Sequence, residues 1–293
     1  MIRCQVFFLS RMIRIVLVLL VFTTFTISGE AKTFTVNQTG DDGDGNLLDG
    51  RADSNVLLPG DQTTLRAAIE QANFDDGHDT VEFDISSGHQ IISPNSPYPD
   101  ITDPITIDGT TQPGYSGSPL IEIRGGSALT TLDASGFVLS AGQSTIRGVV
   151  INRFGRHGIH IDGNSENTIE GNYIGTDHEG EVSPLPQVDP GNGQHGILIS
   201  NSSNNTIGGT TAQPGSDPGN LISGNQGDGI QITGSEATGN RILSNFIGTN
   251  SSGQNAAGNG ESGIHIRSPQ NRVGGPSDDS RNVLSGNALT GVF

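Results

Sequence analysis

The chain has few of the residues that cross-link a fold, bind soft metals or stack on sugars. Among its 293 residues are one cysteine, Cys4, no tryptophan and three tyrosines. Beyond Cys4 there can be no disulfide, no thiolate metal site and no cysteine nucleophile. Positive charge is also scarce, because Lys32 is the only lysine and the formal net charge is −17. Electrostatic repulsion therefore disfavours nucleic acid and anionic membranes as partners.

The N-terminus has the pattern of a secretory signal peptide. Three arginines precede an apolar run at residues 15–27, and small residues at positions 29 and 31 suit a cleavage site. The run is shorter than the about 20 apolar residues that span a membrane. An uncleaved membrane anchor is the alternative. We expect cleavage after Ala31, a secreted or cell-surface protein, and no membrane span in the mature chain.

The sequence is rich in glycine, with 43 residues, and it repeats itself. The phrase "HGIHIDGNSENTIEGN" at 157–172 returns as "HGILISNSSNNTIGG" at 195–209 and, more loosely, as "SGIHIRSPQNRVGG" at 262–275. Each repeat holds three short apolar alternations in a fixed order, separated by Gly, Asn and Ser. A repeat this short has no room for a helical crossover, and one alternation cannot bury its apolar face alone.

Coiling the chain so that each alternation pairs with its copy in the next coil buries these faces. The sequence therefore predicts an all-β protein, a right-handed parallel β-helix with three short strands per coil. A β-propeller is the alternative, but its blades need four longer strands. The first alternations would stack inward at about 4.8 Å per rung: Ile159, Ile161, Ile197, Ile199, Ile230, Ile232, Ile264 and Ile266.

Four asparagines recur at one turn of the repeat. Asparagine tolerates left-handed backbone angles, and its amide can stack in ladders from coil to coil. We interpret this set as structural: Asn172, Asn220, Asn245 and Asn282.

Residues 32–100 differ from the repeats. Their patterns predict a strand at 33–37, a helix at 63–73 with Thr63 or Thr64 as N-cap, and a strand at 79–85. This strand–helix–strand unit would cap the first coil. We expect three parts in the chain: a signal peptide at 1–31, the cap at 32–100, and a β-helix at 101–293 that is truncated in a fifth coil or covered there by another chain.

The segments "TFTVNQTGDDGDGN", "TTLRAAIEQAN" and "DTVEFDI" resemble the CSLREAI-type domain that opens many exported bacterial β-helix proteins. The motif here, at residues 63–69, lacks the cysteine and the glutamate of that domain. The segments at 105–115 and 144–155 look like the β-helix repeats that accompany it. The resemblance covers residues 32–293. It implies a pectin-lyase-like fold and a secreted or surface location, and it implies no particular reaction.

The acidic segment "DGDGNLLDGRAD" at 42–53 has the spacing of a calcium loop. Asp42, Asp44, Asn46 and Asp53 occupy its first, third, fifth and twelfth positions, which lets oxygens surround one cation. The sixth position is Leu47, where the turn favours glycine. Calcium is thus a possible cofactor, and a solvated acidic loop is the alternative.

A second possible metal site lies just before the first alternations. His157 and His195 precede the glycines of successive coils, and Asp228 holds the same place one coil later. Stacking would bring the three side chains close enough for a His-His-Asp metal site. The alternative is that they are simply polar residues before a turn glycine.

Arg241 and Arg272 occupy adjacent coils in the second alternation and should point outward. Two stacked guanidinium groups would suit the carboxylate of a uronate sugar. Pairing with acidic neighbours on a surface poor in cations is the alternative.

No catalytic residue can be identified from the sequence. Polysaccharide hydrolases need paired carboxylates at a defined spacing, and the pair Asp278-Asp279 lies in an inserted loop. Such loops follow the third alternation at 175–194 and 248–261, and the second at 208–219 and 274–281; loops on a rigid scaffold often carry binding sites. We interpret the chain as a structural or adhesive β-helix protein whose partners are polysaccharides or cell-surface glycans. A polysaccharide lyase, hydrolase or epimerase is the alternative.

Overall fold

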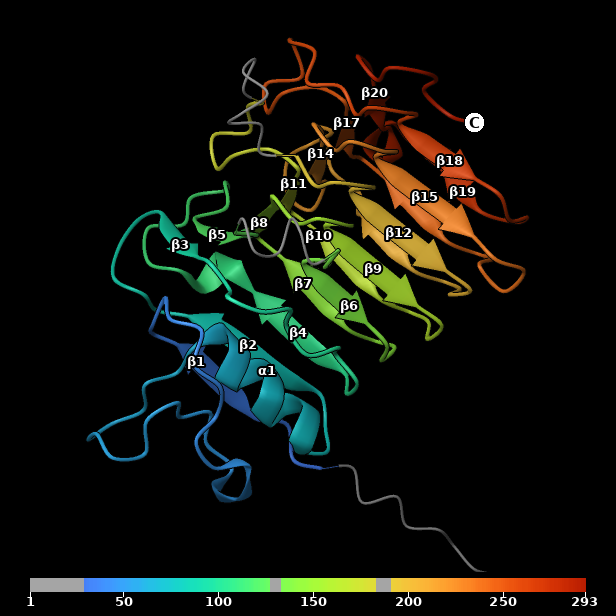
Figure 1. Cartoon of the computed structure of the whole chain (residues 1–293). Helices are drawn as coiled ribbons and strands as arrows, with labels where there is room; N and C mark the ends of the chain where they lie inside the picture. Colours follow the sequence, from blue (N-terminus) through green and yellow to red (C-terminus); the bar gives the residue numbers. More distant parts are fainter. Residues whose placement is uncertain (1–28, 127–132, 183–190) are drawn as a thin grey trace, which may run out of the picture.

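The computed structural model describes residues 29–126, 133–182 and 191–293. They form a right-handed coil of short strands that climbs from the N-terminal helix to the last strands (Figure 1). The strands line up in three sheets, and every pair of neighbouring strands is parallel. The predicted parallel β-helix is thereby confirmed, and a propeller, which is built from antiparallel blades, is excluded. The predicted signal peptide lies almost wholly outside the described residues.

We call the sheets A, B and C. Sheet A consists of β1 (Thr33–Val36), β2 (Asp79–Phe83), β4 (Ile105–Asp108), β7 (Thr145–Arg147), β10 (Thr168–Glu170), β13 (Thr206–Gly208), β16 (Arg241–Leu243) and β19 (Arg272–Val273). Sheet B consists of β3 (Gln90–Ile92), β5 (Ile121–Arg124), β8 (Val149–Asn152), β11 (Tyr173–Ile174), β14 (Leu221–Ile222), β17 (Phe246–Ile247) and β20 (Val283–Leu284). Sheet C consists of β6 (Phe137–Leu139), β9 (Ile159–Asp162), β12 (Ile197–Ser200), β15 (Ile230–Thr233) and β18 (Ile264–Ile266).

The core runs along the axis of the coil as stacked isoleucines. Ile159 lies in register with Ile197, and Ile197 with Ile230, as the repeat predicts. All three side chains are fully buried. Burying one such side chain contributes about 1.5–3 kcal/mol, so the columns supply the apolar burial that a single coil lacks. At the last rung Ile266 is only half-buried.

Buried asparagines form ladders along the corners between the sheets. In the predicted column, the Oδ1 atom of Asn220 accepts hydrogen bonds from the backbone N–H of Asn172 at 3.0 Å and from its Nδ2 at 3.2 Å. The predicted left-handed backbone is wrong for this column, because none of its asparagines has a positive φ; the residue before takes that conformation at Gly171 and Ser244. Two further columns make the same contacts: Asn192, Asn225, Asn259 and Asn287, and Asn167, Asn205, Asn240 and Asn271.

The N-terminal region forms the predicted strand, helix and strand. Helix α1 (Leu65–Phe74) begins after Thr64, whose Oγ1 accepts the backbone N–H of Ala67 at 3.0 Å. Its buried face packs on β1 and β2 at one end of the core (Figure 1). Because β1 and β2 extend sheet A, the cap and the coils share one continuous sheet. Short 3-10 turns complete the structure at Leu47–Asp49, Gly109–Thr111 and Asp278–Ser280.

Candidate metal centre

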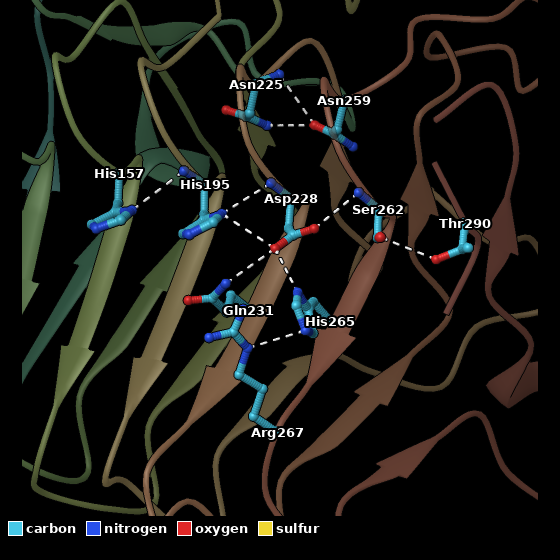
Figure 2. A network of polar contacts seen from close by, with 10 residues as sticks. All are labelled: His157, His195, Asn225, Asp228, Gln231, Asn259, Ser262, His265, Arg267 and Thr290. Atoms are coloured by element: carbon cyan, nitrogen blue, oxygen red, sulfur yellow. Dashed lines mark hydrogen bonds and ion pairs between the residues drawn. The ribbon is translucent and has the colours of Figure 1, made fainter. Parts of the chain in front are cut away.

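The predicted His-His-Asp set lies on consecutive rungs at the start of β9, β12 and β15 (Figure 2). The rings of His157 and His195 stack with centroids 5.2 Å apart, and Nδ1 of His195 lies 3.6 Å from Oδ2 of Asp228. One ligand atom each of His195, Asp228 and the exposed Glu261 lies within 4.8 Å of the others. The sequence thus places these side chains together correctly, while metal binding by them stays a prediction.

Each of these side chains accepts a hydrogen bond from the backbone of the next coil (Figure 2). Nδ1 of His157 accepts the N–H of His195 at 3.3 Å, and Nδ1 of His195 accepts the N–H of Asp228 at 2.9 Å. Oδ1 of Asp228 in turn accepts the N–H of Ser262 at 2.9 Å. The set is therefore a ladder like those of the asparagines. An imidazole whose Nδ1 accepts a hydrogen bond carries its proton on Nε2, which leaves it no lone pair for a cation.

The other oxygen of Asp228 is held by the outward face of sheet C (Figure 2). Its Oδ2 lies 3.2 Å from Nε2 of Gln231 and 3.3 Å from Nδ1 of His265, whose Nε2 accepts from Nε of Arg267 at 3.1 Å. Burial lowers the pKa of His157 to about 3 and also lowers the pKa of His195. We conclude that the histidines of the ladder are neutral and that the Nδ1 atom of each is occupied by a backbone N–H of the next coil.

A second cluster lies on the outer side of sheet B and joins His89, Glu122 and His178. His89 stands before β3, Glu122 points outward from β5, and His178 belongs to the loop after β11. The two imidazole rings stack with centroids 3.7 Å apart, and Nε2 of His89 lies 2.9 Å from Oε2 of Glu122. One ligand atom of each residue lies within 4.8 Å of the other two.

Glu122 is the buried centre of this cluster, with its side chain 1% exposed. Its second oxygen, Oε1, accepts from Nε of Arg124 at 2.8 Å and from Nδ2 of Asn152 at 3.0 Å. Burial acts to raise the pKa of Glu122, but these hydrogen bonds outweigh it and hold that pKa below its usual value. Burial and the neighbouring His178 lower the pKa of His89. The cluster therefore combines an ionised carboxylate with a histidine that favours its neutral form.

The predicted calcium residues serve the turns of their own loop. Oδ1 of Asp44 accepts the N–H of Asn46 at 2.8 Å, and Oδ1 of Asp53 accepts the N–H groups of Asn55 and Gln62 at 2.9 and 3.1 Å. Asn46 likewise accepts from the N–H of Leu48 at 3.3 Å, and Asp42 is exposed. Calcium at Asp42, Asp44, Asn46 and Asp53 stays a prediction.

Arg241 and Arg272 lie opposite each other on β16 and β19, as predicted, and both are exposed. Within the described residues neither guanidinium forms an ion pair; Nε of Arg272 donates to the carbonyl of Gly274 at 3.0 Å. The described residues therefore do not show the alternative, in which these arginines pair with acidic neighbours.

The model of one protein family, described as periplasmic copper-binding protein (NosD), matches residues 81–271. The chain belongs to the NosD family. The match spans the coils from β2 to the end of β18, in agreement with the parallel β-helix. It leaves out the CSLREAI-like motif at residues 63–69, so that resemblance stays a prediction. No curated protein matches the chain.

The NosD family is periplasmic by its description, which confirms the predicted secreted or cell-surface location. Across residues 29–126, 133–182 and 191–293, none of the helices has the length and apolar character needed to cross a membrane.

Sequence reasoning missed the cluster of His89, Glu122 and His178 in this NosD-family chain. The three residues come from three coils, and no repeated spacing links them. Glu122 is the one weak signal of this cluster in the sequence, because it is an acidic residue between the inward-facing Ile121 and Ile123. Whether its carboxylate is buried depends on the loops that cover the strand, and the alternating pattern does not give their path.

Proposed function

We propose that this NosD-family chain is an exported β-helix protein that binds a copper(II) ion at His89, Glu122 and His178. The observation that carries the proposal is the buried carboxylate of Glu122, which meets two stacked imidazoles on the outer side of sheet B. The description of the family as copper-binding supports the choice of metal.

The composition selects the oxidation state. The sulphur atoms of the chain belong to Met1, Cys4 and Met12, all inside the predicted signal peptide. Copper(I) prefers thiolate and thioether ligands, whereas imidazole and carboxylate suit copper(II). A site in the mature chain would therefore hold copper(II).

The hydrogen bonds of the cluster fit such a ligand set. Nε2 of His89 and Oε2 of Glu122 lie 2.9 Å apart and share one proton. When the imidazole carries that proton on Nδ1 instead, Nε2 and Oε2 can both bind a cation. Arg124 and Asn152 hold the other oxygen of Glu122 and orient the carboxylate, as supporting residues do around metal ligands. The lowered pKa of His89 keeps this ligand in the neutral form that binding requires.

Calorimetric titration with copper(II), in glycine buffer as a competing ligand, tests the proposal. We expect one ion per chain and an affinity that falls in His178→Ala by more than the roughly 10–100-fold loss caused by removing a supporting residue. His178 is the preferred position because it lies on a loop, outside the strands. His78→Ala is the matched control, since His78 is an exposed histidine that contacts Thr106. Equal affinities for His178→Ala and the unaltered protein would overturn the site.

A structural or adhesive role with acidic glycans as partners is the second candidate. The observation that favours it is the exposed pair Arg241 and Arg272, adjacent on sheet A and without ion pairs among the described residues of a very acidic chain. Guanidinium groups bind carboxylates in a bidentate way, which supports a uronate as the ligand. In this role the β-helix is a rigid scaffold that presents its arginines and loops.

A further inference from the structure

A cavity of about 480 Å³ lies over the outer face of sheet B, between two loops that the repeat inserts. Its volume is typical of small-molecule sites. Phe246 of β17 and Val283 of β20 line it from the sheet, and residues of the loops at 208–219 and 248–261 form its walls. The polar side chains of the lining include Gln213, Ser216, Ser252 and Arg281.

The two loops are fixed against the ring of Phe246. A Cβ atom added to Gly215 would overlap Cδ2 of the ring, and one added to Gly253 would lie 2.7 Å from Cζ. The backbone N–H of Gly215 also donates to the carbonyl of Ser244 at 2.7 Å, and the N–H of Ser251 donates to the carbonyl of Gly180 at 3.0 Å. The walls of the cavity are therefore built before any ligand arrives.

Among the residues that the structure describes, the lining combines an apolar surface with one cation and no carboxylate, in a chain with 31 acidic residues. Within the described residues, Arg281 has no ion pair, and the side chains of Gln213 and Ser216 have no hydrogen-bond partner. An aromatic side chain, hydroxyl and amide groups and an unpaired guanidinium are the chemistry that recognises an acidic sugar.

The cavity beside β1 is larger, at about 570 Å³, but its cations are already neutralised. Lys32 pairs with Asp75 at 2.8 Å, and Arg51 pairs with Asp61. Unpaired positive charge therefore distinguishes the cavity at Arg281 from this one.

We propose that the cavity between the two loops binds a uronic acid residue of a polysaccharide, with Arg281 on its carboxylate and Phe246 and Val283 beneath its ring. This inference rests on the second candidate function and is independent of copper. Ser216, Ser252 and Gln213 supply hydrogen bonds to the sugar hydroxyls. The site lies on sheet B, whereas Arg241 and Arg272 lie on sheet A.

Calorimetric titration with tetragalacturonate, and with neutral galactotetraose for comparison, tests the site. We expect binding of the acidic oligosaccharide alone, and weaker binding as salt is added. Arg281→Ala should weaken it roughly 10- to 100-fold, the range that one charge-assisted hydrogen bond spans. Arg267→Ala is the control and should bind as tightly as the unaltered protein, because Arg267 is an exposed arginine that follows β18 of sheet C and does not line the cavity. Thermal unfolding of both variants verifies that they fold.

The other outcomes separate the site from the function. Loss of tetragalacturonate binding in Arg241→Ala/Arg272→Ala, with binding by Arg281→Ala unchanged, would overturn the cavity and leave the glycan role at sheet A. Equal binding of the acidic and the neutral oligosaccharide would overturn the role of Arg281. No binding of tetragalacturonate by the unaltered protein would overturn both the cavity and the glycan role.

Discussion

Removing one amide from the central asparagine ladder should weaken the fold severely. Asn220 is fully buried, and its Oδ1 accepts two hydrogen bonds from Asn172. Its Nδ2 donates to the carbonyl of Ile169 at 2.8 Å and to Oδ1 of Asn245 at 2.9 Å. The substitution Asn220→Ala breaks these hydrogen bonds to both neighbouring coils and leaves the backbone N–H of Asn172 buried without its acceptor.

The expected fall in the free energy of unfolding follows from the hydrogen bonds that the substitution breaks. A buried hydrogen bond contributes about 0.5–1.5 kcal/mol net, so the four hydrogen bonds of the Asn220 side chain together account for roughly 2–6 kcal/mol. A loss of this size would lower the melting temperature by roughly 2–4 °C per kcal/mol. Urea unfolding gives the free energy of unfolding from the midpoint and the slope.

Asn255→Ala is the matched control, because Asn255 is exposed and outside the ladders, and it should stay within about 0.5 kcal/mol of the unaltered protein. If Asn220→Ala unfolded at the same urea concentration as Asn255→Ala, the ladders would not be what holds the coils together.

The histidine ladder and the loops give two further predictions. Burial holds the pKa of His157 at about 3 in the folded chain, against about 6.5 in the unfolded chain, so the unfolded chain is protonated first as the pH falls. The free energy of unfolding should therefore fall by roughly 3–5 kcal/mol between about pH 6.5 and pH 3. Urea unfolding of His157→Gln over the same pH range should show a smaller fall. Gly215→Ala should lower the melting temperature more than Gly60→Ala, since both glycines have a positive φ but only Gly215 faces Phe246; equal shifts would show that the ring does not fix the loop.

Almost the whole scaffold can be predicted from the sequence, because aligning the repeats gives the register of the strands in successive coils. Each first alternation carries isoleucines at matching positions, so stacking one coil on the next predicts which residues pair and which face inward. The asparagine column and the neighbouring arginines Arg241 and Arg272 follow from the same alignment. The left-handed residues do not follow from it: Ser244 takes a positive φ although serine has no special preference for one.

The candidate sites depend on what the repeat does not encode. His178 and the walls around Phe246 lie on inserted loops, whose path over sheet B has no counterpart in the alternating pattern. The same limit explains the histidine ladder. Alignment places His157 beside His195, but it does not reveal that each Nδ1 accepts a backbone N–H. Which nitrogen is free for a ligand is a matter of local hydrogen bonding, and hydrogen bonding is visible only in the folded chain.

Electron paramagnetic resonance of the purified protein with one equivalent of copper(II) is the decisive test of the copper site. We expect the spectrum of the unaltered protein to show couplings from two imidazole nitrogens. The spectra of His89→Ala and of His178→Ala should each show coupling from one imidazole nitrogen, while His78→Ala should leave the spectrum unchanged. Spectra identical in the unaltered protein and in the His89 and His178 variants would contradict copper binding at this cluster.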